Sequence, residues 1–547
     1  MSTATPTGDG VSAVPDWLPD EATLTRMANE FFAALPDQQQ AATPSIATTV
    51  SPALVAPFPE RFEPSTRAPA TPAGLPTTPA GLPTTPAGHP TTPAGLPAVG
   101  PAVPRFYFID ELASVGQAVT QEPVAGQTPI PAQIQPTFDL FDVETVRAQF
   151  PILAERINGR RLVWLDNAAT TQKPQAVIDR LAYFYEHENS NIHRGAHVLA
   201  ARATDAYENA RRTVADFLGA SSSETVIFTR GATEAINLVA QAWGRRHIGT
   251  GDEIVISHLE HHANIVPWQQ LAEQTGATLK IIPVDEDGQL LLESYQDLLT
   301  DRTRIVAVSQ VSNALGTVVP ISQVIAAAHR VNAKVLIDGA QAVAHVPVDV
   351  QALDADFYAF SGHKVFAPTG IGVLYGKPEV LEAMPPWQGG GNMISDVTFE
   401  HTTYQRPPAR FEAGTGSIAD AAGLGAALDY LNRIGLESIA HYEHELLGHA
   451  TRAISGVPGL RPIGTAPDKA SVFSFVLDGY QPEEVGTALN KQGIAVRAGH
   501  HCAQPILRRF GLEATVRPSL AMYNTRAEID LLVAALRRLA ADAGNLR

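Results

Sequence analysis

The chain has 547 residues, of which 45% are hydrophobic and 17% are charged, with a formal net charge of -17 and one cysteine. The acidic balance argues against broad nucleic-acid binding, and a single cysteine excludes an intrachain disulfide. The N-terminus lacks a secretory signal, and no apolar stretch approaches the roughly 20 residues of a membrane helix. We therefore expect a cytoplasmic protein of more than one domain, with no membrane or nucleic-acid partner.

Residues 1–137 differ in composition from the rest of the chain. Between Thr71 and Pro97 a seven-residue unit repeats as TPAGLPT, TPAGLPT, TPAGHPT and TPAGLP. Two prolines per unit prevent a continuous helix, and the few large apolar side chains cannot offset the entropy of ordering, which predicts a disordered linker. Two apolar islands, Trp17–Leu35 and Phe106–Leu112, are of the kind that order on a partner; the alternative is loose packing on the chain's own catalytic domain.

From about residue 138, apolar strand-like runs alternate with helical segments. This alternation predicts a large α/β domain with a mostly parallel sheet over residues 138–405 and a smaller α/β domain over residues 406–547. Polar residues follow five of the strand-like runs, and ligands in open α/β sheets bind at the carboxyl ends of strands. We expect these five residues to converge on one pocket: Arg230, His261, Asn313, Asp338 and Lys364.

Three of the segments suit a phosphate-bearing aldehyde cofactor. A lysine such as Lys364, carried into a pocket by a strand, loses hydration and gains the reactive amine that a Schiff base requires. A carboxylate such as Asp338, buried at a strand end, needs a cation, which a pyridinium nitrogen would supply. The turn at 231–233 opens a helix whose backbone N–H groups could hold phosphate. Taken singly, each has a plainer alternative: a surface lysine, a helix N-cap aspartate and an ordinary glycine turn.

Ten stretches in sequence order carry a specific resemblance. They are LDNAATTQKP, NIHRGAHVLA, RGATEAINLVA, EHHANIVPWQ, VSNALGTVVP, DGAQAVAHVPVDV, SGHKVFAPTGIGVLYGK, RFEAGTGSIAD, RAGHHCAQP and RPSLAMYNT. From about residue 138 onward the chain resembles the group II, sulfur-mobilisation type cysteine desulfurases of the class V aminotransferase family. The resemblance implies fold type I, with a seven-stranded-type sheet, a smaller C-terminal domain, a pyridoxal 5'-phosphate cofactor and a homodimer.

The resemblance also implies a role for each motif residue. Lys364 would hold the cofactor and move protons, and His261 would stack on the ring and act in acid–base catalysis. Asp338 would pair with the pyridine nitrogen and Gln341 with the ring hydroxyl. The remaining cofactor contacts, to the phosphate, would come from Thr233, Ser361, His363, the backbone of Ala232 and, from the partner subunit, Thr415. Because the family often has threonine where this chain has Ala232, one hydroxyl contact is missing.

Substrate binding and sulfur transfer are implied in the same way. Asn313 and Arg517 would bind the substrate carboxylate, since arginine offers a bidentate fork, and Arg497 lies close to the thiol in the motif. The thiolate of Cys502 would take sulfur from L-cysteine, leaving L-alanine and a persulfide for iron–sulfur cluster assembly or sulfur storage, with an acceptor protein as the next partner. Arg497, His500 or His501 could supply the positive field that a thiolate needs.

Several alternatives stay open for Cys502 and for the enzyme. A metal site at His500, His501 and Cys502 is disfavoured because adjacent residues point in different directions, so we expect no metal. A buried structural cysteine, a selenocysteine lyase, a desulfinase that does not need the cysteine and a catalytically idle scaffold are the others.

The N-terminal extension resembles those of cysteine desulfurases packaged inside encapsulin nanocompartments. That resemblance implies an encapsulin shell protein as a partner and a location inside the compartment. The alternative is a cytosolic desulfurase whose extension is a passive linker.

Overall fold

A computed structural model describes residues 141–193 and 197–545. The extension at 1–137, its repeat and both apolar islands lie outside the described residues. The described helices are α3 (Val143–Ala148), α4 (Gln175–His187), α5 (Val198–Phe217), α6 (Ala232–Leu238), α7 (Arg245–His247), α8 (Val266–Thr275), α9 (Leu292–Leu298), α10 (Ile321–Arg330), α11 (Pro378–Ala383), α12 (Ile418–Ile434), α13 (Leu436–Ser455), α14 (Pro482–Asn490), α15 (Gln504–Arg509) and α16 (Arg526–Asn545).

Short 3-10 and π segments complete the helical part. The 3-10 segments are η2 (Pro151–Ala154), η3 (Ser223–Thr225), η5 (His262–Asn264), η6 (Gly362–Lys364) and η7 (Ala409–Phe411), and the π segment η4 (Val239–Gly244) continues α6 into α7. No helix in the part of the chain that the structure describes has both the length and the apolar character to cross a membrane.

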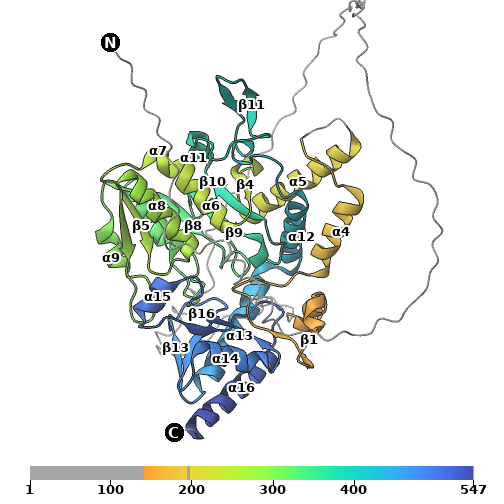
Figure 1. Ribbon diagram of the computed structural model, residues 1–547, viewed down its shortest axis with the longest axis vertical. Coiled ribbons are helices and arrows are strands. Elements are labelled where there is room, and N and C mark those ends of the chain that lie inside the picture. The colour runs from red at the N-terminus through yellow and green to blue at the C-terminus, as the bar shows by residue number, and fades with distance from the viewer. Residues whose placement is uncertain (1–140, 194–196, 546–547) are drawn as a thin grey trace, which may run out of the picture. The chain divides into compact units, whose positions relative to one another are not determined.

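A seven-stranded sheet forms the centre of the larger domain in the described residues (Figure 1). Its order is β4 (Val226–Thr229), β10 (Gly372–Gly376), β9 (Phe357–Ser361), β8 (Lys334–Asp338), β7 (Thr303–Ser309), β5 (Glu253–Ser257) and β6 (Thr278–Ile282). Only β10 runs antiparallel to its neighbours, so the predicted, mostly parallel sheet is confirmed. Strands such as VLID and FYAFS are buried along their whole length because helices cover both faces.

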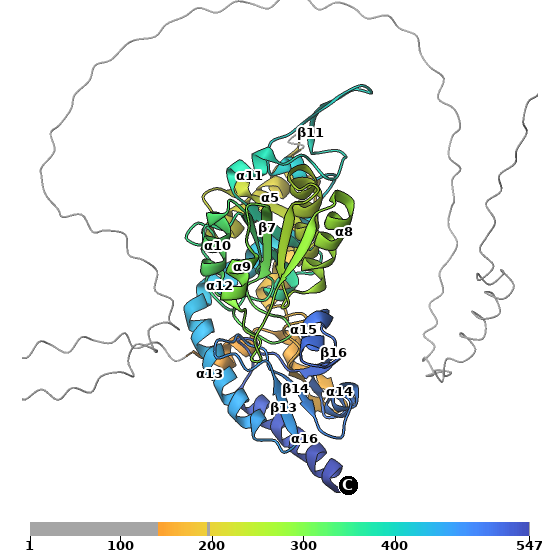
Figure 2. The ribbon, with the colours of Figure 1, turned by 90° about the vertical axis from the view of Figure 1, so that its left-hand side faces the viewer.

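Alternating side chains of each strand enter two different cores. In β8, Val335 and Ile337 pack with the core that contains α5, α10 and α12, whereas Leu336 packs with the core that contains α6 and α8. Figure 2 shows β7 between α10 on one side and α8 on the other. The layers explain why these strands are continuous apolar runs, and they leave the strand ends as the place for polar groups.

The smaller domain contains a four-stranded sheet in the described residues. Its order is β13 (Leu460–Ile463), β14 (Ser474–Leu477), β17 (Thr515–Arg517) and β16 (Arg497–Gly499), all antiparallel. The remaining strands form two-stranded pairs: β1 (Arg156–Ile157) with β2 (Arg160–Arg161), β11 (Ile394–Val397) with β12 (Thr402–Tyr404), and β3 (Val163–Trp164) with β15 (Ile494–Ala495). α12 packs against α4 and α5 of the larger domain, and the boundary at residue 405 stays a prediction.

Candidate active site

The carboxyl ends of β7, β8 and β9 lie side by side, because Ser309 is in register with Asp338 and Asp338 with Ala359. A cavity of about 260 Å³ opens at this edge. Of the predicted site residues, twelve line it: Ala232, Thr233, His261, Asn313, Asp338, Gln341, Ser361, His363, Lys364, Arg497, Cys502 and Arg517. The expected convergence of strand ends therefore holds for His261, Asn313, Asp338 and Lys364.

Arg230 and Thr415 do not line this cavity. The side chain of Arg230 is 80% exposed and pairs with Glu234 at 3.3 Å, so the expectation that it joins the pocket is wrong. The next residues along the chain, Ala232 and Thr233, take that place instead. Thr415 is exposed on the described surface of the chain, and its role across a subunit interface stays a prediction.

Lys364 reaches the cavity from η6, directly after β9. The turn is held from below by the loop after β3: the backbone N–H of Thr171 donates to the His363 carbonyl at 3.0 Å, and Thr171 Oγ1 accepts from Phe366 N at 2.8 Å. Burial lowers the pKa of Lys364 to about 8, an effect that nearby Asp338 and Cys502 oppose and Arg517 strengthens. An amine with this pKa is readily unprotonated, as condensation with an aldehyde requires.

Asp338 ends β8 and is buried on the other side of the cavity floor. Its Oδ1 accepts from the Ala340 backbone N–H at 3.0 Å, and burial raises its pKa despite that bond and the charge of Lys364. A carboxylate held in this way is stabilised by any cation placed against it. Gln341, three residues on, donates from Nε2 to the Ala168 carbonyl at 2.6 Å, which fixes its amide at the cavity wall.

The opposite end of the cavity is formed where the turn before α6 meets the end of β9. The Ala232 backbone N–H donates to Ser361 Oγ at 2.8 Å, and a Cβ on Gly231 would lie only 3.2 Å from that oxygen. Thr233 and His363 complete this end. Burial and the charges of Lys364 and Lys173 lower the pKa of His363 to about 4, so its ring is neutral at pH 7.

His261 caps η5 and lies in the cavity wall. Its Nδ1 accepts from Ala263 N at 3.0 Å, which leaves the proton of the neutral ring on Nε2. Burial, with the charges of Lys364, His262 and Arg517, lowers its pKa to about 3. A neutral ring at this position can stack on a flat cofactor and exchange a proton through Nε2.

Arg517, on β17, brings a buried positive charge to the cavity. Nη1 donates to the Asn313 carbonyl at 2.8 Å and Nη2 to Asp166 Oδ1 at 3.4 Å. Its Nε is buried and has no hydrogen-bond partner among the described residues, so one donor remains for a ligand. Burial lowers the pKa of Arg517 to about 10, and the guanidinium still carries its charge at pH 7. A carboxylate is the anion that its geometry suits.

Asp166 is a site residue that we did not predict. It accepts from Arg517 and also from Arg497, whose Nη2 lies 3.0 Å from Oδ2. It therefore holds two cations at the cavity that would otherwise repel each other. A signal was present in the sequence, because Asp166 follows the strand-like run RLVWLD in the same way that Asp338 follows its strand.

The loop that carries Cys502 is tightly held. His262 N donates to the Cys502 carbonyl at 2.8 Å, Cys502 N donates to His500 Nδ1 at 3.0 Å, and Asn313 Nδ2 donates to the His501 carbonyl at 2.6 Å. His501 and Cys502 have φ angles of +55° and +54°, which non-glycine residues adopt only where the surroundings impose them. The thiol side chain is exposed at the cavity, so it is accessible to a bound substrate.

The histidines next to Cys502 differ in their electrostatic role. Burial, with the charges of Arg517 and Arg497, lowers the pKa of His501 to about 2, so this ring is neutral and supplies no positive field. Its Nε2 lies 2.8 Å from Thr515 Oγ1, which fixes the ring beneath the loop. Of the three residues proposed to supply positive charge, Arg497 is the one with a permanent charge at the cavity.

Comparison with known proteins agrees with this geometry. Residues 163–532 match the family described as aminotransferase class-V. A cysteine desulfurase of Synechococcus elongatus is 64% identical over 442 residues, which are 79% of this chain and 71% of that protein, and one of Dickeya dadantii is 52% identical over 400 residues, 73% and 97%. The chain belongs to the class V aminotransferase family. Within it, the relatives place the chain among the pyridoxal-phosphate-dependent cysteine desulfurases.

Solved structures of this group share the fold. The crystal structure of the cysteine desulfurase CsdA from Escherichia coli, in its S-sulfonic acid form, superposes with a TM-score of 0.69 at 42% identity and covers 74% of this chain and 99% of that one. The apo cysteine desulfurase of Thermococcus onnurineus gives 0.70 at 36% identity, covering 73% and 98%. The sequence-based prediction of the family, its fold and its cofactor is confirmed.

The residues of this cavity fit pyridoxal phosphate. A buried amine of low pKa faces a buried carboxylate, the Ser361 end presents a close backbone turn, and a neutral imidazole lies between them. Lys364 would hold the aldehyde carbon, Asp338 the ring nitrogen and the Ser361 end the phosphate. The individual roles of these residues stay predictions.

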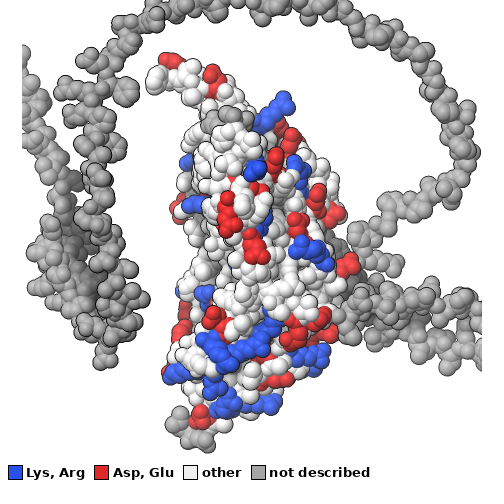
Figure 3. Space-filling view, turned by 90° about the vertical axis from the view of Figure 1, so that its right-hand side faces the viewer, with Lys and Arg blue, Asp and Glu red and all other residues white. Residues whose placement is uncertain are grey.

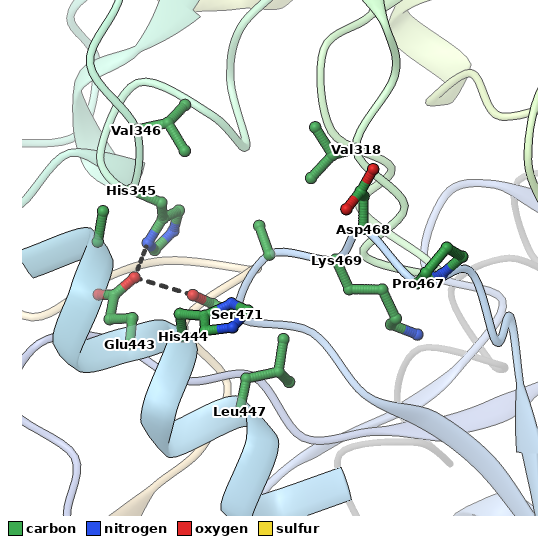
Figure 4. Close-up of a pocket in the computed structure, with 12 residues that line it drawn as sticks. Val318, His345, Val346, Glu443, His444, Leu447, Pro467, Asp468, Lys469 and Ser471 are labelled. Atoms are coloured by element: carbon green, nitrogen blue, oxygen red, sulfur yellow. Dashed lines mark hydrogen bonds and ion pairs between the residues drawn. The ribbon is translucent and has the colours of Figure 1, made fainter. Parts of the chain in front are cut away.

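A second, smaller cavity of about 50 Å³ lies where the two domains meet (Figure 4). Glu443 of α13 accepts from His345 Nδ1 at 2.7 Å and from Ser471 Oγ at 2.9 Å, and Figure 4 shows Lys469 on the other side of the opening. Burial disfavours protonation of His345, but Glu443 outweighs it and raises the pKa of His345 above its usual value. The pair therefore joins α13 to the segment after β8 by a charged hydrogen bond. No cluster of three metal-ligating side chains occurs in the described part of the chain.

Proposed function

We propose that this enzyme converts L-cysteine into L-alanine and moves the sulfur atom to Cys502 as a persulfide. The observation that carries the proposal is that the chain's single cysteine lies in the same cavity as Lys364, Asp338 and Arg517. A thiol in that place can reach the sulfur of an amino acid whose carboxylate is held by Arg517.

Each residue then has a defined task. Arg517 Nε and the Asn313 region bind the substrate carboxylate. Bound pyridoxal phosphate supplies an electron-poor ring that stabilises negative charge left at Cα. The Lys364 amine takes the proton from Cα, and its pKa of about 8 suits that exchange near neutral pH.

Cys502 completes the reaction. Its thiolate attacks the substrate sulfur, the bond from carbon to sulfur breaks, and a bond between two sulfur atoms forms on Cys502. The three-carbon remainder takes up a proton and leaves as alanine. The tightly held loop keeps the thiol pointed at the cavity, since three hydrogen bonds fix residues 500–502.

A Cys502→Ser variant tests this step. The variant should keep the absorbance of the bound cofactor but lose sulfur transfer from L-cysteine, because serine cannot form a persulfide. Lys364→Ala is the matched control, since it should lose the covalent attachment of the cofactor as well. Sulfur release by Cys502→Ser at the rate of the unaltered enzyme would show that the cysteine has another role.

The biological setting forms part of the same proposal. The persulfide passes to an acceptor protein in iron–sulfur cluster assembly or in sulfur storage, in the cytoplasm. The enzyme acts as a homodimer, which is supported by the position of Thr415: it is exposed and lies away from the cavity of its own chain, so it is available to a second copy. The N-terminal extension directs the enzyme into an encapsulin compartment, which its proline-rich repeat and two apolar islands support.

A further inference from the structure

A cluster of exposed positive side chains lies on the smaller domain. We name it the arginine face: Arg156, Arg160, Arg161, Lys491 and Arg538. Figure 3 shows Lys and Arg gathered over the lower part of the molecule, on the side where β1 lies in Figure 1. All five side chains are exposed, and Ile157 between them is 36% exposed.

Backbone and side-chain contacts hold the arginine face together. The turn at Gly493 packs so closely on β2 that a Cβ there would lie 3.1 Å from Arg160 Cβ, and Asn158 Nδ2 donates to the Asn490 carbonyl at 3.0 Å. Arg538, from α16, donates to Gln492 in the same turn. Three segments far apart in sequence are thus fixed beside one another, and the positive charges they carry are brought to one surface.

The arginine face has no internal compensation of its charge. The three segments that form it, residues 156–161, 488–494 and 531–541, contain no Asp or Glu, although the whole chain has 56 acidic and 39 basic residues. None of its five side chains forms an ion pair within residues 141–193 and 197–545, whereas many other arginines there do. Clustered, unpaired arginines beside an exposed isoleucine are typical of a surface that receives a partner.

The arginine face is connected to the thiol by a short piece of rigid chain. From Gly493 the chain runs through β15 and β16 to Cys502, nine residues later. Nine residues span at most about 30 Å even when fully extended. A small protein that contacts the usual area of about 800 Å² on one side covers a patch of comparable width. One docked protein can therefore lie on the arginine face and reach the thiol.

We propose that the arginine face is the docking surface for an acidic sulfur-acceptor protein, an inference that rests on the proposed persulfide on Cys502. Acidic side chains of the acceptor pair with the unpaired arginines and bring an acceptor thiol to the cavity mouth. Protein is favoured over nucleic acid because the surface is confined to five cations around an apolar side chain, on a chain of net charge -17.

The transfer step is balanced without another reactant. A thiolate of the acceptor attacks the outer sulfur of the Cys502 persulfide. The bond between the two sulfurs on Cys502 breaks, a new bond between two sulfurs forms on the acceptor, and Cys502 leaves as thiolate. The proton lost by the acceptor thiol ends on either product, and no net oxidation occurs.

The test uses the full-length holoenzyme and two synthetic acceptor peptides. One has about twelve glutamates and a C-terminal cysteine, enough to span about 40 Å; in the other, serine replaces each glutamate. The rate of alanine formation from L-cysteine at low salt, driven by each peptide thiol, is the readout. We expect the glutamate peptide to be at least about tenfold faster, because charge attraction raises encounter rates by this order, and we expect salt to remove the difference.

Two matched variants locate the effect. Arg160→Glu with Arg161→Glu should bring the ratio of the two rates close to one. Arg245→Glu with Arg246→Glu makes the same charge change at exposed residues of α7 and should preserve the ratio. Both variants should form alanine normally with dithiothreitol, since neither touches the cavity.

Three results would overturn the docking proposal: a ratio near one in the unaltered enzyme while dithiothreitol supports alanine formation, an equal loss in both variants, or tighter binding of a single-stranded RNA of equal charge than of the glutamate peptide. Absence of alanine with dithiothreitol would instead contradict the proposed function itself, so the two failures are distinguishable.

Discussion

Replacing Glu412 with alanine should lower the free energy of unfolding by about 3 kcal/mol. Its carboxylate pairs with Arg211 through contacts of 2.6 and 3.0 Å, and it also accepts from Phe228 N at 2.8 Å and from Tyr207 Oη at 3.0 Å. The side chains of Arg211 and Glu412 are only 2% and 6% exposed. The substitution therefore leaves a guanidinium, an amide and a hydroxyl buried without their acceptor.

The expected magnitude follows from what remains around Arg211. Removing one partner of a buried ion pair typically costs about 3 to 5 kcal/mol. Glu208 still accepts from Arg211 Nε at 3.0 Å and from Nη2 at 3.3 Å, which places the cost at the lower end. The Glu208→Ala variant is the matched control, because the Glu208 side chain is 32% exposed, and it should cost less than about 1 kcal/mol.

Urea unfolding of the holoenzyme variants, followed by circular dichroism, measures both losses under one condition. Glu412 lies three residues before Thr415, and the Asn392 side chain donates to its carbonyl at 3.0 Å, so the ion pair also anchors the segment that carries Thr415. A loss for Glu412→Ala no greater than that for Glu208→Ala would refute the reasoning.

Two further predictions concern the cofactor lysine and the extension. Because burial lowers the pKa of Lys364 from 10.5 to about 8, its charge destabilises the cofactor-free fold below pH 8, and the cost is relieved as the pH rises towards 10.5. Cofactor-free Lys364→Met should therefore be more stable than the unaltered protein by about 3 kcal/mol at pH 7, with the advantage gone above pH 10.5 in urea unfolding; an advantage that grows with pH would contradict this. Deletion of residues 1–135 should preserve desulfurase activity and abolish co-purification with a shell protein, whereas loss of activity would indicate a catalytic role for the extension.

Much of the active site was predictable because parallel strands end at one edge of a sheet. His261, Asn313, Asp338 and Lys364 each follow an apolar run, and the structure brings them to one cavity. Arg230 follows such a run too, but its side chain turns outward to Glu234, a local ion pair that strand periodicity does not reveal.

Contacts between distant segments were beyond the sequence patterns. Asp166 bonds to Arg497 and Arg517, which are 331 and 351 positions away, so no local spacing links them. The neutral state of His501 was equally hidden, because it comes from burial by residues of other strands and from the charges of the same two arginines. The arginine face is a third example, since three separate segments form it.

The most direct test of the account is the mass of the peptide that contains Cys502 after one turnover. Holoenzyme is mixed with one equivalent of L-cysteine without any other thiol, quenched by alkylation and digested. The account predicts that the Cys502 peptide gains the mass of one sulfur atom and that an equal amount of alanine appears. Alanine formation with no sulfur added to Cys502 would contradict it.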